Sequence, residues 1–97
     1  MELMTQQIKY KEARMILLQY LRQVAAEKKI THAHIAEKTG FSRNNVSRML
    51  MGRYSPSLEN FIKLAEVIDV YIFIIDKQED NDLVNIMKHR WGNLFIQ

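Results

Sequence analysis

A nearly unbroken row of hydrogen-bonding side chains, from Ser42 to Arg48, follows Gly40 in the sequence. A guanidinium fork suits the two acceptors of guanine and a carboxamide suits the donor and acceptor of adenine, and each bidentate pair contributes about 1–3 kcal/mol of discrimination. Because a helix in the major groove meets base edges with its outer face, we expect this row to read DNA. The expected base-contacting residues are Arg43, Asn44, Asn45, Ser47 and Arg48. An ordinary solvated helix face is the alternative interpretation.

The basic charge of the chain is concentrated in its middle. Residues 28–58 hold six lysines and arginines against one acid, Glu37, whereas the rest of the chain holds eight basic and ten acidic residues. Such asymmetry indicates a polyanionic partner, although a solvated basic face would have the same composition. Contacts to phosphate set the register of a protein on DNA rather than the sequence that it reads. The residues expected to make them are Lys38, Ser42, Arg53, Tyr54 and Ser55.

Four helices are expected to position these side chains. Apolar residues recur every three or four positions over residues 6–28, which predicts a long first helix. Thr31 and Ser42 are suitable N-caps for two short helices, and Gly40 suits the left-handed turn between them. Ser57 is expected to cap a fourth helix. Its predicted inward face comprises Leu58, Phe61, Ile62, Leu64, Ala65 and Ile68.

Two short helices joined by a glycine turn define a helix-turn-helix. This motif needs a small residue where the helices cross, here Ala36, and apolar residues that seal both helices onto the others. The sealing residues are Ile35, Phe41, Val46, Met49 and Leu50. All these requirements are met at mutually consistent spacing, which makes the motif a specific one.

Residues 30–70 resemble the lambda-repressor-like helix-turn-helix family, also called the XRE or Cro/repressor type. The matching residues are Thr31, Ile35-Ala36, Lys38, Gly40-Phe41-Ser42-Arg43, Val46-Ser47-Arg48, Gly52, Pro56-Ser57-Leu58 and Leu64-Ala65. The resemblance implies a sequence-specific DNA-binding regulator, and proteins of this family are usually dimeric. One position departs from the pattern, because the family often has glutamine where this chain has His32. The imidazole of His32 is expected to contact phosphate in place of that glutamine.

The character of the sequence changes after the fourth helix. The segment VYIFIID, residues 70–76, is β-branched and aromatic on both alternating faces, which predicts a β-strand. Because the backbone groups of a strand need a partner, we expect it to pair with a second copy of the chain, or else with residues 93–97. The expected dimer interface comprises Val70, Tyr71, Ile72, Phe73, Ile74 and Ile75. Residues 81–91 are expected to form a last helix.

The predicted fold is therefore mainly α, with four to five helices, a C-terminal β-strand and a final helix. Residues 1–69 would be the DNA-binding domain and residues 70–97 a dimerisation extension. The histidines at positions 32, 34 and 89 lack the spacing of a zinc site, and we expect no metal or other cofactor. No catalytic constellation is visible, so an enzyme is not expected. The chain contains no apolar run long enough for a membrane span and no signal core at its start, which predicts a cytoplasmic protein.

Together these patterns predict a homodimeric transcriptional regulator, and in the first place a repressor, that binds a palindromic operator in double-stranded DNA. Two alternatives stay open. One is an antitoxin similar to HigA-type proteins, which would bind a toxin protein as well as its own promoter. The other is a protein–protein adaptor that uses the same fold without DNA.

Overall fold

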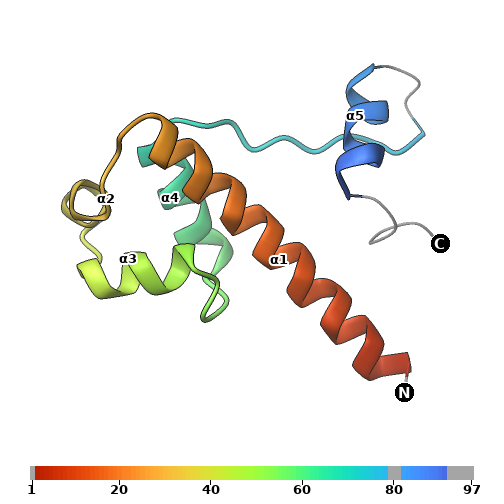
Figure 1. The fold of residues 1–97 in the computed structure, drawn as a ribbon, viewed down its shortest axis with the longest axis horizontal. Helices are drawn as coiled ribbons and strands as arrows, with labels where there is room; N and C mark the ends of the chain where they lie inside the picture. Colours follow the sequence, from red (N-terminus) through yellow and green to blue (C-terminus); the bar gives the residue numbers. More distant parts are fainter. Residues whose placement is uncertain (1, 79–81, 92–97) are drawn as a thin grey trace.

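The computed structural model describes residues 2–78 and 82–91, and this part of the chain forms five helices. They are α1 (Glu2–Glu27), α2 (His32–Thr39), α3 (Arg43–Leu50), α4 (Leu58–Ile68) and α5 (Asp82–Trp91). Helices α3 and α4 pack against α1, and α2 packs against α3 and α4. The first turns of α1 extend beyond the other three helices (Figure 1). The four helices expected before residue 70 are therefore confirmed, and α1 begins earlier than its apolar stripe predicts.

The three predicted N-caps are confirmed. The hydroxyl oxygens of Thr31, Ser42 and Ser57 each accept a hydrogen bond, at 3.1 Å, from the backbone N–H three residues further on. Each bond satisfies one of the donors that the first turn of a helix leaves without an intrahelical partner. Local sequence therefore decides where α2, α3 and α4 begin.

Residues in the left-handed conformation follow each of the helices α1 to α4. Gly40, with φ of 83°, follows α2 as predicted, and Gly52, with φ of 72°, follows α3. After α1 and α4 this conformation falls on non-glycine residues, Lys29 and Asp69, with φ of 60° and 64°. The residues after these two, Ile30 and Val70, donate backbone hydrogen bonds to the last turns of their helices and pack against the core. Burial of those apolar side chains helps to hold a backbone conformation that costs L-residues about 1–2 kcal/mol.

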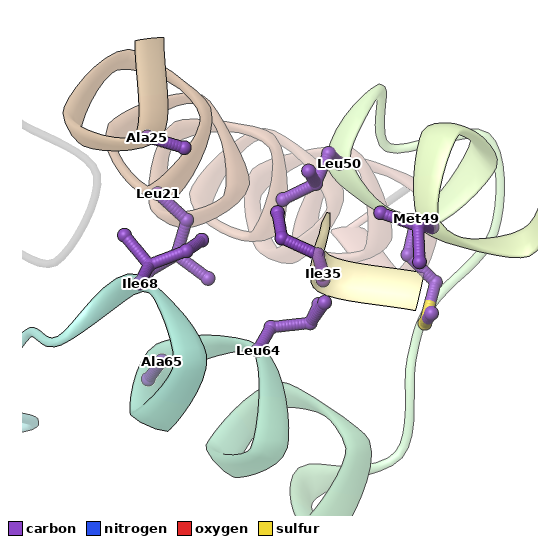
Figure 2. Packing of buried hydrophobic residues seen from close by; sticks show 9 residues of the cluster. Leu21, Ala25, Ile35, Met49, Leu50, Leu64, Ala65 and Ile68 are labelled. Carbon is purple, nitrogen blue, oxygen red and sulfur yellow. The ribbon is translucent and has the colours of Figure 1, made fainter. Parts of the chain in front are cut away.

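The hydrophobic core is built from α1, α2, α3 and α4. Its buried cluster consists of Leu21, Ala25, Ile35, Val46, Met49, Leu50, Leu64, Ala65 and Ile68. Ile35 of α2 lies at its centre, between Leu50 of α3 and Leu64 of α4 (Figure 2). Ala36 and Phe41 pack against the cluster from its edge. The predicted packing of the two short helices is therefore confirmed.

The predicted inward face of α4 is wrong at two positions. Leu64, Ala65 and Ile68 are buried, but Leu58 is 72% exposed and Ile62 is 46% exposed. At 3.6 residues per turn, Leu58 and Ile62 lie at the edge of the apolar stripe rather than at its centre. Helices α1 and α2 cover the centre of the stripe and leave that edge in solvent.

The predicted C-terminal β-strand is also wrong. Residues 70–76 contain no strand, and among residues 2–78 and 82–91 there is no sheet for them to join. They form an elongated connection from α4 to α5 (Figure 1). β-Branched and aromatic residues favour a strand only when a neighbouring strand completes its hydrogen bonds, and the described part of the chain supplies none. The alternative partner, residues 93–97, lies outside the described residues.

The last helix is confirmed, with a start at Asp82; residue 81, where it was expected to begin, lies outside the described residues. Val84 of this helix is buried, whereas Leu83 and Ile86 are exposed. Within residues 2–78 and 82–91, no helix has both the length and the apolar character needed to cross a lipid bilayer.

Candidate DNA-binding face

The outer face of α3 carries the row of polar residues that the sequence singled out. Val46, Met49 and Leu50 of this helix are buried in the core. The polar residues lie on the remaining surface: Arg43, Asn44, Asn45 and Arg48 are exposed and Ser47 is half-buried. Their hydrogen-bonding groups are therefore available to a partner that lies along α3.

A short hydrogen-bonded turn sets the angle between α2 and α3. The Thr39 hydroxyl donates to the carbonyl of Ile35 at 2.7 Å and accepts from the backbone N–H of Phe41 at 3.2 Å. Gly40 lies between them in the left-handed conformation. Sequence reasoning missed the role of Thr39, although a threonine before a left-handed glycine is a signal that could have revealed it.

Arg22 of α1 holds the C-terminal end of α3. Its guanidinium donates hydrogen bonds of 3.1 Å to the carbonyl oxygen of Leu50 and to the sulfur of Met51. A cation at the C-terminal end of a helix satisfies a free carbonyl and opposes the helix dipole. Arg22 was missed because it is 28 residues from Leu50, and no local pattern in α1 indicates the contact.

Arg48 lies over the aromatic ring of Tyr54. The guanidinium carbon is 5.2 Å from the ring centroid, within the range of a cation–π contact. The left-handed Gly52 and a 2.9 Å hydrogen bond from the Arg53 N–H to the Arg48 carbonyl turn the chain back beneath α3. Tyr54 is half-buried and packs against the core, so its ring is held in place.

The residues expected to contact phosphate are distributed around α3. Lys38, Ser42, Arg53 and Ser55 are exposed, whereas His32 and Tyr54 are half-buried. The Ser42 oxygen already accepts the N-cap hydrogen bond from Asn45, and its hydroxyl proton is left to donate.

One lysine of the basic middle segment is engaged elsewhere. The ammonium group of Lys28 donates hydrogen bonds of 2.8 Å to the carbonyl oxygens of Ile68 and Asp69, at the C-terminal end of α4. Its charge therefore stabilises a helix end, and we do not count it among the candidate DNA contacts.

In the described part of the chain, no three histidine, aspartate or glutamate side chains converge as metal ligands would. The chain matches the family model described as helix-turn-helix over residues 18–75, from the middle of α1 to the connection after α4. No curated protein and no solved structure gives a significant match. The matched region includes α2, α3 and α4 and all of the polar row on α3.

Proposed function

The chain belongs to the XRE-type, lambda-repressor-like helix-turn-helix family, and we propose that it represses transcription by binding a palindromic operator as a homodimer. It is a DNA-binding transcriptional regulator, its family binds double-stranded DNA, and that family is not normally enzymatic. The observation that best supports the proposal is the exposed polar face of α3. Buried apolar residues hold the other side of this helix in the core, so the polar face is presented to solvent.

Base reading is assigned to the outer face of α3. Arg43 lies in the first turn and Arg48 in the last, with the polar residues Asn44, Asn45 and Ser47 between them. A guanidinium pairs with guanine and a carboxamide with adenine through two hydrogen bonds each. A helix of eight residues thus offers several direct contacts to one half-site.

Phosphate binding is assigned to groups at the edges of that face. Lys38 and Arg53 are exposed cations, and Ser42 and Ser55 are exposed hydroxyl donors. His32, at the N-terminal end of α2, completes the set with its imidazole. No acidic residue occurs between Lys38 and Leu58, so nothing in that stretch repels the DNA backbone.

A homodimer is proposed because one short helix reads only part of an operator. Two copies related by a two-fold axis place their reading helices about 34–36 Å apart, which matches one turn of DNA. The dimer contact is assigned to the connection after α4, where Tyr71, Ile72, Phe73 and Ile74 are exposed. Val70 and Ile75 flank this segment and are half-buried. Residues 70–97 would then be the dimerisation extension of a DNA-binding domain formed by residues 1–69.

The same exposed segment supports the second candidate function, an antitoxin. Four consecutive apolar residues in solvent would suit a partner protein as well as a second copy. The two functions differ in whether the segment is covered when no other protein is present. A dimer buries it without any other protein, whereas an antitoxin could leave it open until a toxin binds.

Selection of bound duplexes from a random pool, followed by fluorescence anisotropy on the selected site, tests the proposed function. Arg43→Ala and Arg48→Ala are each expected to reduce discrimination at one base pair per half-site, by about 1–3 kcal/mol. Lys88→Ala is the control, because it removes a charge from the exposed face of α5 instead. Unchanged base preference in both arginine variants would refute the assignment of α3 as the reading helix.

A further inference from the structure

We propose that Tyr54 is a positioning residue for Arg48, which makes it a determinant of sequence specificity rather than a phosphate contact. The inference rests on the proposed function, in which Arg48 reads a base. The juxtaposition that supports it is the Arg48 guanidinium, 5.2 Å from the centroid of the Tyr54 ring.

The two partners differ in how firmly they are held. Tyr54 is half-buried and packs against the hydrophobic cluster, whereas Arg48 is exposed. The path of the chain between them is fixed by the left-handed Gly52 and by the hydrogen bond from the Arg53 N–H to the Arg48 carbonyl. A fixed ring thus lies beneath a long side chain that would otherwise sample many rotamers.

A fixed ring changes the amount of side-chain entropy that Arg48 loses when it binds a base. An arginine side chain has high rotamer entropy, and part of it is lost when the guanidinium pairs with a base. If the ring already restricts the guanidinium, less side-chain entropy is lost on binding. The affinity for the correct base then rises more than the affinity for a base that offers no paired acceptors. The effect acts on discrimination at the base pair that Arg48 reads.

The ring and the hydroxyl of Tyr54 can be separated by substitution. Tyr54→Phe keeps the ring and removes the hydroxyl, so discrimination at the Arg48 base pair should stay at the wild-type value. Tyr54→Leu removes the ring, and that discrimination should fall about two- to fivefold, the usual contribution of an exposed cation–π contact. In an Arg48→Ala background, Tyr54→Leu should cause no further fall.

Phe41 supplies a matched control. Its ring also packs partly buried against the core beneath a cation, with the Lys63 ammonium 5.6 Å from the ring centroid. Lys63 belongs to α4 and is not among the base-reading residues. Phe41→Leu should therefore lower the stability of the fold as Tyr54→Leu does, but leave discrimination at the Arg48 base pair unchanged.

The measurement is the ratio of dissociation constants for the four base pairs at the position that Arg48→Ala relaxes, below the melting temperature of each variant. Equal discrimination in Tyr54→Leu and the wild type, a gain in Tyr54→Leu, or an equal loss in Phe41→Leu would overturn the inference alone. So would a loss of affinity in Tyr54→Phe that matches Tyr54→Leu on every sequence, because it would assign the hydroxyl to phosphate. A wild-type chain without sequence preference would overturn the proposed function as well.

Discussion

The two glycines that end α2 and α3 have the same backbone conformation but different surroundings. A Cβ built at Gly40 has no atom within 4 Å, whereas a Cβ built at Gly52 would overlap the sulfur of Met15 on α1. At Gly40 only the left-handed φ disfavours a side chain. At Gly52 the same φ is combined with close approach of the Met15 side chain, so the two positions differ in what a new methyl group would meet.

Gly40→Ala is expected to lower the free energy of unfolding by about 1–2 kcal/mol, the cost of a left-handed L-residue. Gly52→Ala is expected to lower it slightly further, because the new methyl group must displace the flexible end of the Met15 side chain. Urea unfolding of both variants and of Gly52→Ala combined with Met15→Ala measures the difference. The double variant should show a favourable coupling between the two sites. Additive costs would contradict the contact with Met15.

The C-terminal ends of two helices accept hydrogen bonds from residues that are far away in the sequence. The C-terminal ends of α3 and α4 are each held by a cation from α1 or the turn that follows it, Arg22 and Lys28 respectively. These two residues therefore stabilise the C-terminal ends of α3, the proposed reading helix, and of α4. From composition alone, Lys28 would be grouped with the cations proposed to bind DNA. Its hydrogen bonds to the end of α4 distinguish it from Arg53, which is a proposed phosphate contact.

Lys28→Met is expected to affect the stability of the fold, and Arg53→Ala is expected to affect DNA binding. Loss of the two hydrogen bonds from Lys28 should lower the free energy of unfolding by about 1 kcal/mol and leave the salt dependence of DNA binding unchanged. Loss of Arg53 should weaken binding equally on all duplexes and reduce the slope of log K against log salt by about 0.9. Chemical unfolding and salt titrations of both variants provide the measurement. A reduced slope of log K against log salt in Lys28→Met would indicate that Lys28 contacts DNA.

At the scale of the whole molecule, two parts of the chain are held together differently. Among the described residues, the buried cluster comes from α1 to α4, and Figure 2 shows Ile35 between side chains of those helices. The connection that follows exposes apolar side chains, with Tyr71 at 102% and Ile74 at 93% of full exposure. A connection of this composition is stabilised when a second copy covers it, which is the basis of the proposed homodimer.

Tyr71→Ser combined with Ile74→Ser is therefore expected to convert the proposed dimer to a monomer. Sedimentation at micromolar concentration measures the change, and affinity for a full palindrome should fall toward that for a single half-site. Because both side chains are exposed within one chain, the thermal stability of the monomer should not fall. Tyr10→Ser, which removes an exposed aromatic residue from α1, is the control and should leave the dimer intact. A wild-type chain that sediments as a monomer would contradict the proposed interface.

What the sequence determined by itself is local. Capping residues, the left-handed Gly40 and the apolar spacing of α3 act within a few residues, so the helix-turn-helix and its polar face could be predicted. The tertiary structure alone decided which cations hold helix ends, that the Tyr54 ring lies beneath Arg48, and that Leu58 lies in solvent. It also decided that residues 70–76 form no strand. These outcomes depend on interactions between groups that are far apart in the sequence. A carbonyl, an aromatic ring or a strand edge can interact only with a partner that the fold places beside it.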